Sequence, residues 1–111
     1  MLAPIPLSLL PDTALVKVPA EGDYGGEYAP DATISHVRFD STSALRVSEY
    51  VSDDGAQGVL YVDAANSGGA FAIPEGSLVS VDGGKTWMAA LSVSEYMCFG
   101  GAVHHWEVEL R

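Results

Sequence analysis

Two adjacent histidines, His104 and His105, are the residues of this sequence that most readily suggest chemistry. Neighbouring side chains of an extended strand point to opposite faces, so the two imidazoles cannot easily share one metal ion. His105 would share a face with Glu107 and Glu109, and that trio offers nitrogen and carboxylate ligands. No second cluster of ligands accompanies the trio, so no metal ion or cofactor is predicted. His104 is expected to be a hydrogen-bonded histidine at the edge of the core.

The sequence does not predict catalysis. The single cysteine, Cys98, excludes an internal disulfide and lies in an apolar stretch without a neighbouring cation to activate it. The 15 carboxylates show no spacing that isolates one acid–base pair, and there is no Gly-x-Ser-x-Gly elbow or P-loop. An enzyme would need a pocket that gathers His105 with carboxylates, and none is expected.

Residues 80–87, Ser-Val-Asp-Gly-Gly-Lys-Thr-Trp, fit the Asp-box pattern of sialidases and related β-propellers. This resemblance implies a hairpin in which polar side chains bond to the turn backbone and the tryptophan packs beneath, with no catalytic role. One copy in 111 residues cannot form a propeller, which needs several blades. Asp82, Gly83 and Gly84 independently predict a tight hairpin turn, after which Trp87 starts the returning strand.

The rest of the chain alternates short runs of apolar and polar residues with Gly, Pro and Asn turn signals. Strands are expected at about residues 13–18, 35–40, 57–64, 78–81, 87–93 and 103–110. In the second of them, Ser35, Val37 and Phe39 would share one face. The pattern predicts an all-β fold, namely a small single-domain β-barrel or sandwich of five to six strands over residues 1–111.

Two segments fall outside the strand pattern. Residues 1–11 are punctuated by prolines, which predicts an extended N-terminal arm. Residues 46–58 are polar and acidic and too long for a simple hairpin, and a long loop of this kind is usually functional. An ordinary surface loop and an unstructured terminus are the alternative interpretations.

The charge balance restricts the possible partners. With 15 acidic and 5 basic residues, the chain has a net charge of −10. Gripping DNA requires Lys and Arg side chains that displace counterions from phosphates, so DNA binding is not expected. The charge is compatible with solubility, with a position near DNA, or with docking onto basic protein surfaces.

Ordered blocks along the chain resemble the minor capsid proteins of siphophages and prophages of Gram-positive bacteria. The blocks are residues 4–10, 35–38 and 103–110, and residues 60–67 look like the middle strand and turn of the same family. Leu7 departs from the family pattern, which would have a basic residue there.

The resemblance implies a head-closure or stopper subunit of the virion neck, between capsid and tail. Such a subunit is expected to join a homo-oligomeric ring and to direct a long loop into the DNA channel. The implied channel-loop residues are Arg46, Glu49, Tyr50, Val51, Asp53 and Asp54. The implied assembly arm presents apolar side chains, which are expected to be exposed, at Leu2, Ile5, Leu7, Leu9 and Leu10.

The partners implied by the resemblance are an adaptor–portal complex on the head side and tail-completion or tail-tube proteins on the tail side. DNA would pass through the channel without specific binding, no membrane is involved, and the protein would be made in the host cytoplasm. A function of another class remains open, a small β-domain that binds a carbohydrate or protein ligand. Its platform would be Trp87, Trp106 and the tyrosines, so aromatic residues packed in the core would count against it.

Overall fold

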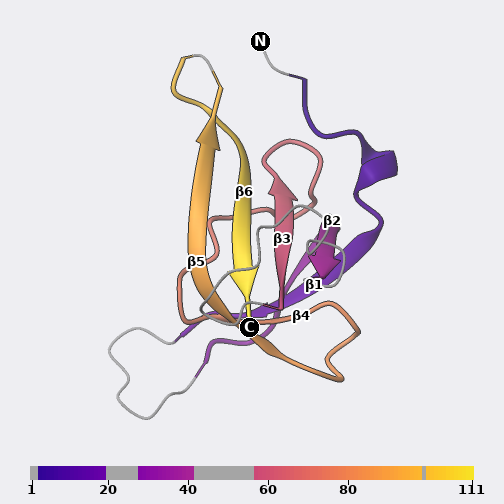
Figure 1. Cartoon of the computed structure of the whole chain (residues 1–111), viewed down its shortest axis with the longest axis vertical. Helices are drawn as coiled ribbons and strands as arrows, with labels where there is room; N and C mark the ends of the chain where they lie inside the picture. Colours follow the sequence, from indigo (N-terminus) through magenta and orange to yellow (C-terminus); the bar gives the residue numbers. More distant parts are fainter. Residues whose placement is uncertain (1–2, 20–27, 42–56, 99) are drawn as a thin grey trace.

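The strands close into a β-barrel. The computed structural model describes residues 3–19, 28–41, 57–98 and 100–111. A 3₁₀ turn, η1 (Leu7–Leu9), precedes the strands β1 (Asp12–Lys17), β2 (Ala32–Ser41), β3 (Gly58–Asp63), β4 (Leu78–Ser80), β5 (Met88–Met97) and β6 (Val103–Leu110). All pairings are antiparallel, in the closed order β1-β2-β3-β6-β5-β4 (Figure 1). The predicted all-β fold is confirmed, and it is a barrel rather than a sandwich.

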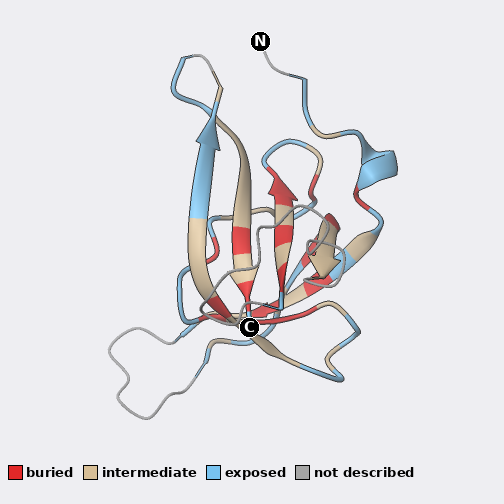
Figure 2. Ribbon diagram, in the orientation of Figure 1, coloured by how far each residue is buried: buried red, intermediate tan, exposed pale blue. Residues whose placement is uncertain are grey.

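The barrel interior is filled by apolar side chains that alternate along the strands. Leu60 and Val62 of β3 are fully buried, while Val59 and Tyr61 between them are only partly so. Val108 and Leu110 of β6 are buried in the same way, and Figure 2 shows this burial concentrated within the barrel. In the described segments, no helix is long and apolar enough to cross a membrane.

Strand β2 departs from the predicted alternation. Ile34 and Val37 are both fully buried although they are three residues apart, and Ser35 is not in the core with Val37. His36 has a φ of 55°, and the register with β1 shifts at this point. A local bulge of this kind reverses the faces of the residues before it, so the expected common face of Ser35, Val37 and Phe39 was wrong.

The short strand β4 closes the barrel unevenly. It contributes only two register pairs to β5, at Leu78 and Val79, whereas β5 pairs with β6 from Ala90 to Met97. As a result, the β5–β6 hairpin extends beyond the rest of the barrel (Figure 1). The N-terminal arm lies toward the same end, and the C-terminus lies at the opposite end.

Candidate functional site

Side chains at the end of β3 form hydrogen bonds with the main chain of the N-terminal arm. Ile5 N donates to Asp63 Oδ1 at 2.9 Å, and Asn66 Nδ2 donates to Ile5 O at 2.8 Å. Further toward the N-terminus, His104 Nε2 lies 2.7 Å from Ala3 O. These contacts therefore hold residues 3–5 against β3 and β6. They involve the main chain of the arm, so most of its side chains stay exposed to solvent.

Asp63 is the centre of this junction. Its side chain is fully buried, and Oδ2 accepts hydrogen bonds from Ala65 N at 3.0 Å and Asn66 N at 2.7 Å. A buried carboxylate is stable only when hydrogen-bond donors replace the water it has lost. For Asp63, three main-chain N–H groups are these donors. Asp63 was not among the predicted site residues, although Asp-Ala-Ala-Asn after a strand is typical of an Asx turn.

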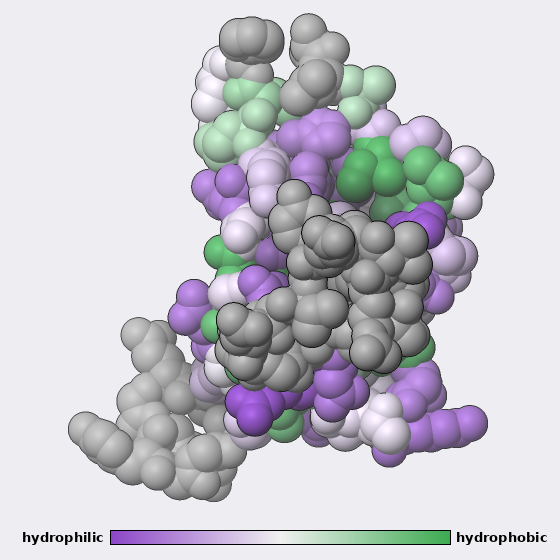
Figure 3. All heavy atoms as spheres, in the orientation of Figure 1, coloured by the Kyte–Doolittle hydropathy of each residue, from purple (hydrophilic) through white to green (hydrophobic). Residues whose placement is uncertain are grey.

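The arm exposes part of its apolar surface. Leu7 and Leu9 are 53% and 48% exposed, and Figure 3 shows hydrophobic side chains gathered where η1 lies in Figure 1. Ile5 is partly buried, and Leu2 lies outside the described residues. Leu10 is only 1% exposed, so its expected exposure was wrong. Its side chain is packed within this chain and is not available to contact another protein.

The predicted channel loop begins and ends at a single point of the barrel. Ser41, the last residue of β2, is paired with Gly58, the first residue of β3. Antiparallel neighbours need only two to about five residues to turn, so residues 42–57 contain an insertion beyond a simple hairpin. The predicted residues within it, which lie outside the described part of the chain, are Arg46, Glu49, Tyr50, Val51, Asp53 and Asp54.

Gly58 closes the base of this insertion and belongs to β3, although the predicted loop extended to residue 58. A Cβ at this position would overlap Asp40 O and would lie 2.6 Å from the ring of Phe39. A side chain does not fit where β3 meets β2 at the base of the insertion, so the glycine here is a packing requirement.

The histidine pair adopts an arrangement that strand alternation did not predict. The Nδ1 atoms of His104 and His105 are 2.8 Å apart, with His105 Nε2 also 2.9 Å from Glu107 Oε2. The outer partners, Ala3 O and Glu107 Oε2, are both acceptors, so both Nε2 atoms donate and one Nδ1 donates to the other. The expected role of His104, a hydrogen-bonded histidine at the core edge, is confirmed.

The trio of His105, Glu107 and Glu109 does not converge on one point. Glu107 contacts His105, whereas Glu109 accepts a hydrogen bond from Ser92 Oγ at 3.1 Å. Among residues 3–19, 28–41, 57–98 and 100–111, no three His, Cys, Asp or Glu side chains are grouped as a metal ion would require.

Tyr61 pairs with Glu107 across β3 and β6. Burial, followed by the charges of Glu107 and Asp40, raises the pKa of the Tyr61 hydroxyl.

The Asp-box segment forms the polar turn that its resemblance implied. Ser80 Oγ donates to Asp82 Oδ1 at 2.8 Å and accepts from Gly84 N at 2.9 Å. Thr86 donates to Asp82 twice, from its N–H at 3.0 Å and from Oγ1 at 2.6 Å. Gly83 and Gly84 have φ values of 78° and 92°, a region that only glycine adopts freely. The segment is a hairpin tip and gathers no catalytic groups.

Acidification is expected to open this turn locally. Hydrogen bonds from Thr86 and then Ser80 hold the pKa of Asp82 well below its ordinary value of 3.8. Because the pKa is depressed in the folded state, the stabilisation is present above about pH 4 and is lost as the pH falls through the folded-state pKa. We expect the Thr86 amide resonance to keep its position down to below pH 3 and then to shift, and Asp82→Asn to remove the transition. A Thr86 shift centred near pH 3.8 would contradict this.

The two tryptophans make contacts within the chain. The ring of Trp87 lies beneath the ammonium of Lys17, at 4.9 Å from the ring centroid. Trp106 packs against the core, and its Nε1 donates to Glu95 Oε2 at 3.2 Å. These positions do not form one exposed platform, which counts against the expected carbohydrate- or protein-binding surface.

Comparison with known proteins identifies the family. The family model described as minor capsid protein matches residues 6–110, almost the whole chain. No curated protein and no solved structure matches. The matched range includes η1, all six strands and the segment between β2 and β3. The chain therefore belongs to the minor capsid protein family and is a structural component of the phage virion.

Proposed function

We propose that this protein is a stopper, or head-closure, subunit that forms a ring in the virion neck. The observation that supports this most is where the N-terminal arm and the insertion join the barrel. The arm is fastened at Asp63, the last residue of β3, and the insertion returns at Gly58, the first. Five strand steps separate these residues by about 17 Å. One end of the barrel can thus contact an adjacent ring while the other directs the insertion to the channel axis.

A ring multiplies whatever charge each subunit directs inward. Glu49, Asp53 and Asp54 would give every copy of the insertion a cluster of negative charge. Negative charge repels the phosphates of DNA, so packaged DNA passes the ring without being bound. Tyr50 and Val51 are the apolar residues through which neighbouring insertions would touch when the channel is closed.

The role is structural rather than catalytic. The ring would contact the adaptor–portal complex on the head side and tail-completion or tail-tube proteins on the tail side. It retains the packaged DNA until the tail is attached, and it provides the surface to which the tail binds. The subunits would be made in the host cytoplasm and incorporated after DNA packaging.

Particles assembled without this protein test the proposal. A stopper subunit is required after packaging, so its loss should leave heads that package DNA, lose it again and carry no tails. Heads should be counted by electron microscopy, and their DNA should be measured before and after nuclease treatment. Complementation with the intact gene is the control. Tailed, DNA-filled particles at the normal level would exclude a stopper role.

The exposed leucines of η1 give a second test, of the docking arm. Changing both Leu7 and Leu9 to serine removes apolar contact area at two exposed positions, so the free energy of unfolding should change by only about 1 kcal/mol. Incorporation into particles, measured by quantitative immunoblotting, should fall by more than about tenfold. Ser8→Ala, on the same turn, is the matched control. Normal incorporation of the double variant would rule out docking through η1.

A further inference from the structure

The outer part of β5 has a strand neighbour on only one side. β4 reaches β5 at Met88 and Ala89, and main-chain bonds from Gly76 and Ser77 extend the contact to Ala90. Beyond this point, residues 92–97 pair with β6, and no described residue pairs with their other edge. Figure 1 shows this part of β5 rising beyond the rest of the barrel. Among the described residues, this edge of β5 therefore has no neighbouring strand.

This edge has few of the features that usually block strand addition. It has no proline or lysine, and its register with β6 is regular between the shifts that flank Ser92 and Tyr96. In an antiparallel pair, every second residue directs its N–H and C=O away from the partner. Residues 94–97 are exposed, with Tyr96 and Met97 at 44% and 47%, so these groups are accessible to another chain.

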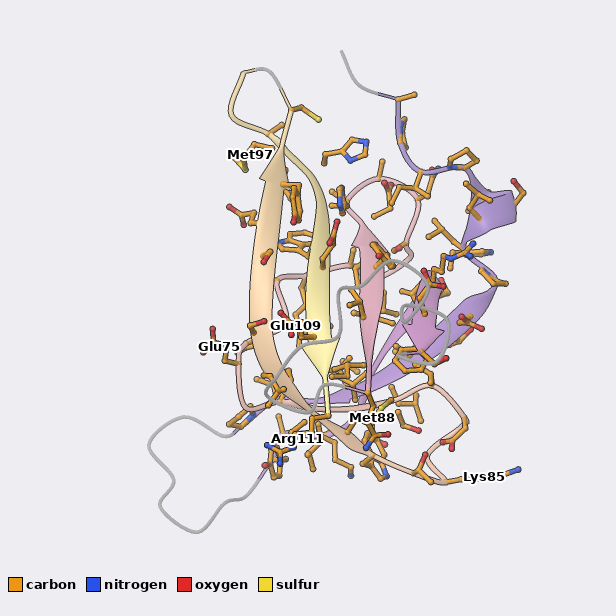
Figure 4. The ribbon with its side chains drawn as sticks, in the orientation of Figure 1. Glu75, Lys85, Met88, Met97, Glu109 and Arg111 are labelled. Atoms are coloured by element: carbon orange, nitrogen blue, oxygen red, sulfur yellow. The ribbon has the colours of Figure 1, made fainter. Side chains whose placement is uncertain are left out.

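The side chains around the edge are mainly acidic. Glu95 lies within it, Glu109 of β6 is paired with Ser92, and Glu75 precedes the residues that contact Ala90. Glu107 is opposite Ser94, and its Oε2 lies 2.9 Å from His105 Nε2. Figure 4 shows Glu75 and Glu109 beside the lower half of β5, between Met97 at its top and Arg111 at the bottom of the molecule.

We propose that residues 92–97 are a docking edge to which an extended basic segment of another protein adds as a strand. Main-chain hydrogen bonds to β5 would supply the binding. Glu95 and Ser92 are three residues apart, so Glu95 and the Glu109 paired with Ser92 lie on opposite faces of the sheet, and Lys or Arg side chains on either face of the added strand would meet a carboxylate. A second copy of this chain is a poor occupant, because it has the same net charge of −10 and would bring like charges together.

Amide exchange of the full-length protein, followed by NMR, tests this docking edge. In dilute protein alone, alternate amides of residues 92–97 should exchange rapidly, while those bonded to β6 are protected. The probe is the amidated peptide Lys-Val-Lys-Val-Lys-Val-Lys. At saturation it should slow the rapid set by about tenfold or more. A peptide with proline in place of valine has the same charge but cannot pair as a strand, and it should leave exchange unchanged.

Two lysine substitutions with the same change in charge complete the test. Ser94→Lys places a cation on the edge and should weaken peptide binding about fivefold, whereas Thr13→Lys, at an exposed position of β1, should not.

Equal protection by the proline peptide would mean that charge alone acts, and no protection by the valine peptide would exclude docking. Slow exchange in dilute protein would show that the edge is covered within the subunit. Protection that increases with protein concentration would identify a second copy as the occupant. Each of these four results overturns the proposal.

Discussion

Replacing Asp63 with alanine is expected to lower the free energy of unfolding by about 3 to 5 kcal/mol. The fully buried carboxylate accepts hydrogen bonds from the main-chain N–H groups of Ile5, Ala65 and Asn66. Removing it leaves those donors without their partner and opens a small cavity. Because Ile5 belongs to the arm, the amide of Ile5 should also lose its protection from exchange. Chemical denaturation and amide exchange measure the two effects.

Two other variants make the Asp63 result specific. Asp12→Ala removes a carboxylate that accepts, among the described residues, one main-chain bond, from Phe39 N at 3.0 Å, and this should lower the free energy of unfolding by about 1 kcal/mol. Asp63→Asn keeps the shape and one acceptor oxygen, so its loss should fall between the two alanine variants. Equal losses for Asp12→Ala and Asp63→Ala would show that Asp63 is not the centre of the junction.

Deleting residues 47–54 is expected to abolish DNA retention while leaving the barrel folded. Ser41 and Gly58 are already paired, so residues 42–46 and 55–57, which remain after the deletion, are long enough to connect the two strands. Under the proposed function, the deletion removes the part of the insertion that reaches the channel axis. Nuclease resistance of the packaged genome in heads assembled with this variant should fall to the level of heads that lack the protein.

A charge variant separates the length of the insertion from its charge. Glu49→Gln combined with Asp53→Asn and Asp54→Asn keeps the chain length and the apolar residues Tyr50 and Val51. Heads with this variant should remain sealed, because closure depends on contact between insertions, but DNA release should slow as repulsion is removed. Heads that contain the deletion variant at the normal level and still protect their DNA would contradict the channel-closing role.

The strands of the barrel could be predicted from the sequence because the patterns that indicate them are local. Alternating apolar residues located all six strands, with ends that differ from the structure by only a few residues at most positions. The turn at Asp82 to Thr86 was likewise predictable, since every partner in it lies within four residues. The sequence left two architectures open, a barrel and a sandwich, because alternation does not distinguish between them.

The features that sequence reasoning missed depend on contacts between distant parts of the chain. The bulge at His36 is coupled to a bridge between Ser35 and Gly68, far along the sequence. The burial of Leu10 and the junction at Asp63 both require the arm to fold back onto the barrel. Exposure was therefore predicted for one leucine too many, and the contacts that hold the arm to the barrel were not predicted.

An image of the intact virion neck at a resolution that traces β-strands tests the central claim most directly. The proposed function predicts a ring of copies of this barrel between the portal complex and the tail. Ser41 and Gly58 should face the channel axis, and η1 should contact an adjacent ring. Barrels located on the capsid shell or within the tail, or a neck ring whose Ser41 and Gly58 face outward, would contradict the stopper role.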